Sequence, residues 1–220
     1  MKACIEFFII LMLLVPASYA WKAETHKNII EYVYLNLPED TQSKLDLGKL
    51  KNGAVMPDRD FRDFRNHHYP NSLREAEKWL KNDTDISLNI GIASHYITDS
   101  FSAPHNIAGE KYSDHNYFEK QVEYYYPVSD CADYGFDPRD MHIAVKNNKD
   151  WNLWLNTKDR AVPEREVEEA TKFLFSVVLK KLNATCSGIS AEVAETKYIT
   201  KRKLAFIITV VLGGLYFLKR

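Results

Sequence analysis

Hydrophobic residues recur at helical spacing along the chain from Trp21 to about Ser187. No segment shows the sustained two-residue alternation that is typical of a half-buried strand. The helical spacing is clearest over residues 25–37, 71–82, 84–101, 113–126 and 165–182. The segment 84–101 is the most apolar of these, so we expect it at the centre of the domain. The pattern predicts an all-α domain built from several helices.

Local polar residues suggest where some of these helices begin. Ser72 precedes one apolar stripe, and Ser113 or Asp114 precedes another. Their side-chain oxygens are of the kind that cap a helix N-terminus. We therefore predict caps at these positions, and an irregular loop over residues 127–138.

The first twenty residues have the pattern of a secretory signal. A positive residue precedes a long apolar run, and small residues occupy positions 18 and 20. Cleavage after Ala20 would make Trp21 the new N-terminus. The alternative is an uncleaved N-terminal anchor.

Residues 204–218 form a second apolar segment, flanked on both sides by lysine and arginine. As a helix of ~1.5 Å rise per residue it would span roughly 22 Å, against a hydrocarbon core of about 30 Å. Snorkelling lysines and local thinning bridge such a mismatch. We predict a C-terminal transmembrane anchor after a linker at 188–203, which leaves 21–187 as the domain. A sorting tail that is later removed and an interfacial helix are the alternatives. An exported protein held at the outer face of a membrane is expected.

Composition narrows the class of protein. The 220 residues are 45% hydrophobic and 27% charged with a net charge of −1, which argues against a surface that coats nucleic acid. Beyond the signal only Cys131 and Cys186 remain. They could form one disulfide, and they are too few for a cysteine-rich zinc site.

Histidines and carboxylates recur at one-turn spacing. His95 and Asp99 are four residues apart, and so are His115 and Glu119, so each pair shares one face of a predicted helix. Pro104 should end the helix and let His105 turn back toward the first pair. A single pair could be an ordinary core histidine with a nearby acid. Two pairs with a histidine between them favour a metal site of nitrogen and oxygen ligands, such as zinc.

Further upstream, a short segment adds acids and histidines. Asp58 precedes Asp60 and Asp63, and the adjacent His67 and His68 follow. Surface charge is a natural interpretation for Asp60 and Asp63. It is less natural for two neighbouring histidines, so the segment is a further source of ligands.

The complete order of these residues resembles the superfamily of zinc-dependent phospholipases C and single-strand-specific zinc nucleases. The matching residues are Trp21, His26, Asp58, His67, His95, Asp99, His105, His115 and Glu119. In that superfamily the mature chain begins with a tryptophan whose amino nitrogen and carbonyl oxygen bind zinc. Removal of residues 1–20 would then create a metal ligand.

The resemblance implies up to three zinc ions. One would be held by Asp58, His67, His95 and Asp99, a second by Trp21, His26 and the bridging Asp99, and a third by His105, His115 and Glu119. His68 is the alternative to His67, although His67 fits the order better. Asp58 would also orient or deprotonate the attacking water, because the resemblance gives this carboxylate a second role as base. The implied reaction is hydrolysis of a phosphoric ester.

The resemblance gives mixed indications of the substrate. The short spacing from Trp21 to His26 is that of the nuclease branch, whereas a glutamate at 119 is that of the phospholipase branch. Glu24 and Phe64 match positions that line a choline pocket. Arg59 departs from that pattern, where tyrosine is expected, and would pair with Glu24 or favour an anionic head group.

The predicted membrane anchor favours a phospholipid substrate, because tethering raises the effective concentration of lipid head groups. A nuclease or 3'-nucleotidase, acting on nucleic acid, is the alternative enzyme. A zinc-binding surface protein without catalytic activity is the alternative from a different class.

Overall fold

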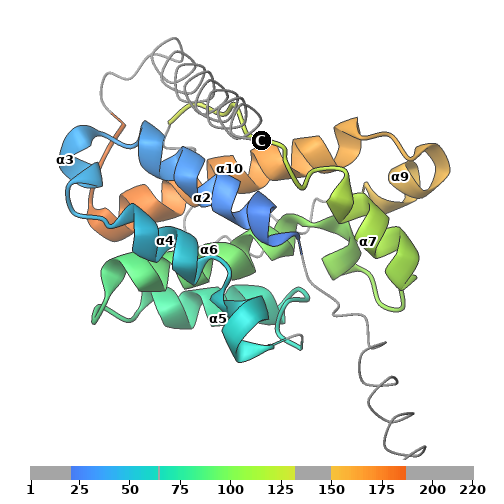
Figure 1. Ribbon diagram of the computed structural model, residues 1–220, viewed down its shortest axis with the longest axis horizontal. Coiled ribbons are helices and arrows are strands. Elements are labelled where there is room, and N and C mark those ends of the chain that lie inside the picture. The colour runs from blue at the N-terminus through green and yellow to red at the C-terminus, as the bar shows by residue number, and fades with distance from the viewer. Residues whose placement is uncertain (1–20, 64, 132–149, 187–220) are drawn as a thin grey trace, which may run out of the picture.

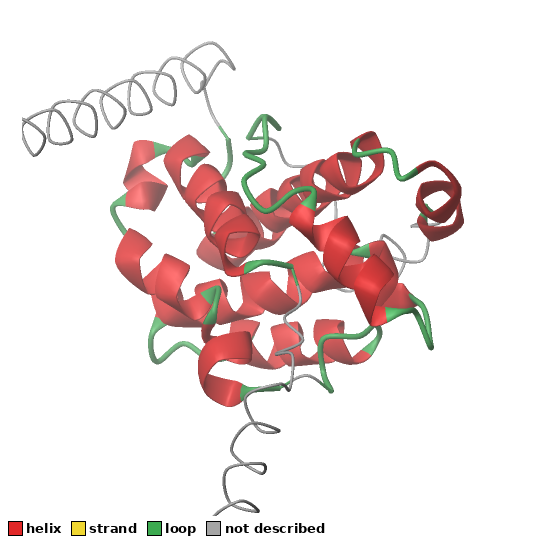
Figure 2. Ribbon diagram, turned by 45° about the vertical axis from the view of Figure 1, so that its right-hand side comes forward, coloured by secondary structure: helices red, strands yellow, loops and turns green. Residues whose placement is uncertain are grey.

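The computed structural model describes residues 21–63, 65–131 and 150–186, and every regular element in these ranges is a helix (Figures 1 and 2). In chain order these are α2 (Ala23–Asn36), α3 (Glu39–Gln42), α4 (Leu47–Gly53), the π-helix η1 (Pro57–Phe61), α5 (Asn71–Leu80), α6 (Ile86–Phe101), the 3-10 helix η2 (Ala103–Asn106), α7 (Tyr112–Lys120), α9 (Trp151–Thr157) and α10 (Ala161–Leu182). The predicted all-α class is confirmed.

Helix α6 lies at the centre of the domain, as its composition predicts. All of its residues except Ile86 and Leu88 are buried. Helices α4, α5 and α10 pack against it, and α2 lies against α4 and α10 (Figure 1). An apolar helix that other helices surround is a common way to bury one continuous core.

Two glycines allow α4 and α6 to approach closely. A Cβ atom built on Gly91 would lie 2.3 Å from the carbonyl oxygen of Leu50, and one on Gly53 would lie 2.5 Å from that of Leu88. Real Cβ atoms do not approach carbonyl oxygens so closely. The backbones of the two helices are therefore in direct contact.

We expect Gly91→Ala to destabilise the domain by at least about 1–3 kcal/mol, the usual cost of overpacking, because backbone atoms cannot move aside as side chains do. Gly48→Ala is the matched control, since a Cβ there meets only the Asp46 carboxylate, at 3.1 Å. Urea unfolding of both variants at one zinc concentration measures the difference. Equal stabilities would show that the contact between the two backbones is not tight.

The predicted helix caps are wrong. Ser72 lies inside α5, where its hydroxyl shares a 2.7 Å hydrogen bond with that of Ser100 in α6. Helix α7 begins at Tyr112, and Asp114 in its first turn accepts a 2.8 Å hydrogen bond from Lys158. In both cases a partner from elsewhere in the fold engages the side chain instead of the local backbone.

Helix α7 also ends earlier than predicted, at Lys120 rather than near residue 126. After Lys120 the main chain forms turns, in which the amide of Tyr125 bonds to the carbonyl of Val122. Thr25 donates a 3.2 Å hydrogen bond to the carbonyl of Val122, and Asn28 one of equal length to that of Tyr125. Helix α2 therefore holds the turns that follow α7.

Cys131 and Cys186 are joined by a disulfide that links the segment after α7 to the end of α10. No helix among residues 21–63, 65–131 and 150–186 is both long and apolar enough to cross a membrane. The predicted signal, linker and anchor, and residues 132–138 of the predicted loop, lie outside the described residues.

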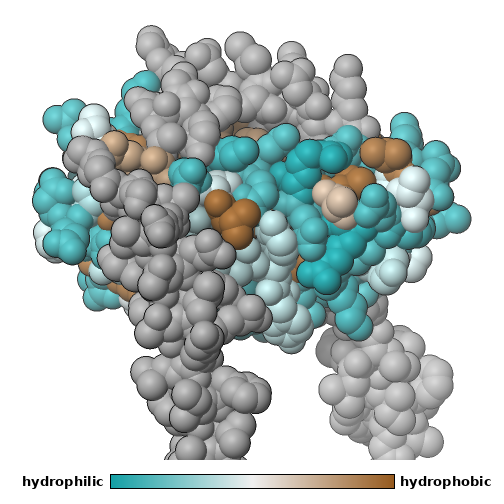
Figure 3. All heavy atoms as spheres, turned by 90° about the horizontal axis from the view of Figure 1, so that it is seen from above, coloured by the Kyte–Doolittle hydropathy of each residue, from teal (hydrophilic) through white to brown (hydrophobic). Residues whose placement is uncertain are grey.

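The face shown in Figure 3 is mostly hydrophilic, with small, separate hydrophobic groups. Most large apolar side chains of the described residues are buried in two clusters. The larger surrounds α6, and the smaller joins α7 and α9 through Phe118, Trp151 and Trp154. The core therefore extends under the helix that carries His115 and Glu119.

Candidate metal centre

Five elements and one loop bring eight of the predicted ligand side chains together. His26 comes from α2, Asp58 from η1, His67 from the loop after η1, His95 and Asp99 from α6, His105 from η2, and His115 and Glu119 from α7. All are buried except His115, whose side chain is 12% exposed. Three groups have donor atoms within 4.8 Å of one another: His26, Asp58 and His95; His67, His95 and Asp99; His105, His115 and Glu119.

Asp99 is the shared member of this arrangement. Its Oδ1 atom lies 3.3 Å from Nε2 of His26, and its Oδ2 atom lies 3.0 Å from Nδ1 of His67 and 3.2 Å from Nε2 of His95. The two carboxylate oxygens therefore face two different sets of histidines. A carboxylate that bridges two cations has this geometry.

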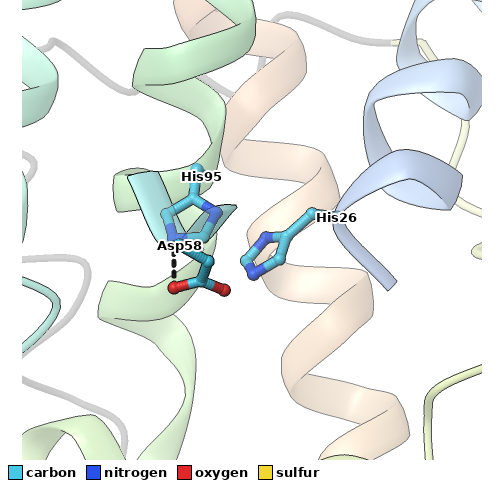
Figure 4. Close-up of side chains that lie close together, drawn as sticks. All are labelled: His26, Asp58 and His95. Atoms are coloured by element: carbon cyan, nitrogen blue, oxygen red, sulfur yellow. Dashed lines mark ion pairs between the residues drawn. The ribbon is translucent and has the colours of Figure 1, made fainter. Parts of the chain in front are cut away.

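Asp58 enters the same space from η1. Figure 4 shows its carboxylate beside His95 and His26. Its Oδ1 atom lies 3.5 Å from Nδ1 of His67 and 3.7 Å from Nε2 of His95. The rings of His26 and His95 stack with centroids 4.1 Å apart. Asp58 lies in a π-helix, an uncommon conformation that is frequent at functional sites.

A third group is built around Glu119. Its Oε1 atom lies 2.7 Å from Nε2 of His115 and 3.2 Å from Nε2 of His105. Helix α6 ends at Phe101, before Pro104, and η2 then directs His105 toward α7. The break after α6 thus separates the third group from the Asp99 group.

Hydrogen bonds fix which ring nitrogen faces the centre. The Thr98 hydroxyl lies 2.9 Å from the carbonyl of Ser94, to which it donates, so it accepts the 2.8 Å hydrogen bond from Nδ1 of His26. Nδ1 of His95 donates to the carbonyl of Ala54 at 2.9 Å. Both rings therefore turn the Nε2 lone pair inward, which is the usual state of a histidine that binds a metal.

The arrangement also leaves buried polar atoms that no hydrogen bond satisfies. Within the described residues these include Nε2 of His26 and His95, Oδ1 of Asp58, both carboxylate oxygens of Asp99, Nδ1 of His105 and Oε2 of Glu119. Several face each other at ion-pair distance without hydrogen-bond geometry. Such groups cost free energy unless something pairs with them. Nitrogen and carboxylate donors at this density fit zinc.

The buried carboxylates and imidazoles shift each other's pKa values. Burial would lower the pKa of His95, but the Asp99 and Asp58 carboxylates raise it to about 9. Burial would raise the pKa of Asp99, but His95, His105 and His26 hold it well below its ordinary range. Burial raises the pKa of Asp58. Without metal the His95 imidazole therefore holds a proton in a place that a cation would otherwise occupy, whereas burial lowers the pKa of His26.

Trp21 and His68 lie outside the three groups of donor atoms. Trp21 is fully buried at the start of α2, with its ring centroid 6.3 Å from that of His26. The structure places His67, and not His68, between Asp58 and Asp99. The ring of His68 is half-buried, 5.2 Å from that of His105.

The two predicted substrate residues that the structure describes, Glu24 and Arg59, pair with other residues. Glu24 is exposed and forms a 2.7 Å ion pair with Lys27. Arg59 binds Asp60 at 2.6 Å and the side chain of Asn52 at 2.9 Å, so its expected pairing with Glu24 is wrong. The guanidinium group of Arg59 pairs instead with the carboxylate of Asp60, the next residue in the chain. Phe64 lies outside the described residues.

The structure adds supporting residues that the sequence does not single out. The Tyr96 hydroxyl donates a 2.9 Å hydrogen bond to Asp63, whose carboxylate also accepts one from Asn66. Asp63 therefore ties the loop of His67 to α6, and its interpretation as plain surface charge is wrong. Nδ1 of His115 lies 3.1 Å from Glu110. A glutamate five residues before His115 carries no spacing signal for this contact.

An all-helical domain with buried, converging imidazoles and carboxylates defines a class of protein that binds zinc through nitrogen and oxygen ligands. Residues 25–184 match a family model described as "Zinc dependent phospholipase C", and the chain belongs to this family. Its metal is zinc. No curated protein and no solved structure matches the chain.

Proposed function

We propose that this protein is a membrane-anchored, extracytoplasmic zinc-dependent hydrolase that cleaves the head groups of phospholipids at a trinuclear zinc site. The observation that carries the proposal is the convergence of three histidines on the two oxygens of Asp99, in a chain of the zinc-dependent phospholipase C family. The family supports hydrolysis of phospholipid, and the buried donor set supports several zinc ions.

The ligand sets follow the resemblance, and the distances from Asp99 to His26, His67 and His95 support them. One zinc would be held by Asp58, His67, His95 and Asp99, the second by Trp21, His26 and Asp99, and the third by His105, His115 and Glu119. For Trp21 the donors are its main-chain nitrogen and oxygen, which requires that residues 1–20 are removed. Asp99 joins the first two sets through its separate oxygens.

The chain's own groups then have distinct tasks. Zinc, when bound, polarises the phosphoryl group and stabilises the charge that develops on the leaving oxygen. Asp58 receives the proton of the attacking water, the role that the resemblance gives to this carboxylate. Water adds to phosphorus, the bond from phosphorus to the glycerol oxygen breaks, and that oxygen takes up a proton from solvent, to which Asp58 releases the proton that it received. The products are diacylglycerol and a phosphorylated head group.

The proposed location rests on the ends of the sequence and on one structural feature. The signal pattern at 1–20 supports export, and the apolar segment 204–218 supports attachment to the membrane. The disulfide between Cys131 and Cys186 is typical of an oxidising compartment. A tethered domain meets phospholipid at high effective concentration.

Hydrolysis assays on zinc-loaded protein test the substrate. We expect release of the phosphorylated head group from phosphatidylcholine or phosphatidylglycerol vesicles, and loss of this activity with a chelator. Single-stranded DNA and a 3'-nucleotide are assayed in parallel, because the Trp21–His26 spacing belongs to the nuclease branch. Faster hydrolysis of DNA would assign the nuclease function, and no hydrolysis with zinc bound would assign a non-catalytic one.

A further inference from the structure

Glu110 is an inward-facing acid in an otherwise exposed loop between η2 and α7. Ile107, Ala108, Gly109 and Lys111 are all exposed, whereas the side chain of Glu110 is only 14% exposed. Its Oε1 atom lies 3.1 Å from Nδ1 of His115. The loop thus directs its one carboxylate onto the third ligand group.

The other nitrogen of the same ring faces the proposed metal position. Nε2 of His115 lies 2.7 Å from Oε1 of Glu119, which is fully buried and also lies 3.2 Å from Nε2 of His105. The imidazole therefore lies between an outer carboxylate and an inner one. When Nδ1 donates its hydrogen to Glu110, the lone pair of Nε2 points inward, where a cation would lie.

The third group differs in this respect from the group around Asp99, which also contains His26, Asp58, His67 and His95. There, Nδ1 of His26 donates to a hydroxyl and Nδ1 of His95 to a main-chain carbonyl, both of which are neutral. That group contains two carboxylates, Asp58 and Asp99. The third group contains only Glu119. A carboxylate behind His115 adds negative charge where the inner donors supply least, and makes the ring a more basic ligand.

We propose that Glu110 is a positioning residue of the third zinc site, which holds His115 in the orientation and tautomer that bind zinc through Nε2. This inference rests on the proposed function, since it requires a third zinc. Glu110 has no place in the ligand order by which the chain resembles its superfamily. It contacts neither zinc nor substrate, and it acts through His115.

The test compares zinc affinities by competition with a chromophoric chelator in the processed protein, which begins at Trp21 and keeps its C-terminal segment. We expect Glu110→Ala to weaken the binding of the third zinc about 10–100-fold, the usual effect of losing such a partner. Glu110→Gln keeps an acceptor oxygen and should lose less. Glu77→Ala is the control, because Glu77 is 36% exposed on α5 and pairs with Lys81. NMR of the zinc-loaded protein should show the Nδ1 proton of His115 protected from exchange in the parent and exposed in Glu110→Ala.

The outcomes separate this inference from the proposed function. If the parent binds three zinc ions and Glu110→Ala binds them as tightly, with its His115 ring proton still protected, the role of Glu110 is overturned and the trinuclear site stands. If the parent binds no third zinc, both fall. The stabilities of the Glu77→Ala and Glu110→Ala variants are compared by unfolding without zinc. If only Glu110→Ala is destabilised, the zinc affinity of Glu110→Gln decides whether Glu110 positions His115.

Discussion

Asp99→Ala is expected to release both zinc ions that this carboxylate is proposed to bridge, and to abolish hydrolysis. The two oxygens of Asp99 face His26 on one side and His67 and His95 on the other, and its side chain is fully buried. Its removal leaves the buried imidazoles without the charge that lies between them. Loss of one partner from a buried group of charges lowers the free energy of unfolding by about 3–5 kcal/mol.

Zinc per chain, measured after gel filtration, checks this prediction, with hydrolysis of phosphatidylcholine vesicles measured on the same samples. Asp83→Ala is the control, because Asp83 precedes α6 and its side chain is 75% exposed. A variant that keeps the parent's zinc content would show that Asp99 is not a bridging ligand. If Asp99→Ala retains only the third zinc, the result would support a third site that binds independently of Asp99.

Helix geometry explains which parts of this centre the sequence predicts. His95 and Asp99, like His115 and Glu119, are one helical turn apart, so their proximity depends only on the helix that carries them. The central position of α6 follows from its composition, because only a buried helix is apolar on nearly every face. These predictions need no knowledge of how distant segments pack.

Other features depend on tertiary contacts and carry no comparable signal. The carbonyl group of Ala54 orients His95, but a main-chain carbonyl is present at every residue. Asp63 has the appearance of surface charge until Tyr96 is found to donate to it. Ser72 suits a helix cap, yet it bonds to Ser100 inside the domain. Gly53 and Gly91 also carry no such signal, and only the packing of α4 on α6 shows why no side chain fits there.

Asp58→Asn is expected to keep zinc and lose activity, which separates an enzyme from a structural zinc protein. Asparagine has nearly the same shape and retains an oxygen donor, so the zinc content should stay close to that of the parent. It cannot accept the proton of the attacking water, and the loss of a general base lowers the rate about 10²–10⁴-fold. The measurement is kcat for head-group release, with zinc content determined on the same preparation.

Asp60→Asn provides the matched control for Asp58, because Asp60 lies in the same π-helix, is 40% exposed and pairs with Arg59 instead of a histidine. Its kcat should equal that of the parent. Unchanged hydrolysis in Asp58→Asn would refute the role of Asp58 as base while leaving its role as ligand open to the zinc measurement. If the parent does not hydrolyse phosphoric esters and Asp58→Asn alters only thermal unfolding, the zinc serves the fold. Asp58 is buried beside His67 and His95, at the proposed metal site, and this position favours the catalytic outcome.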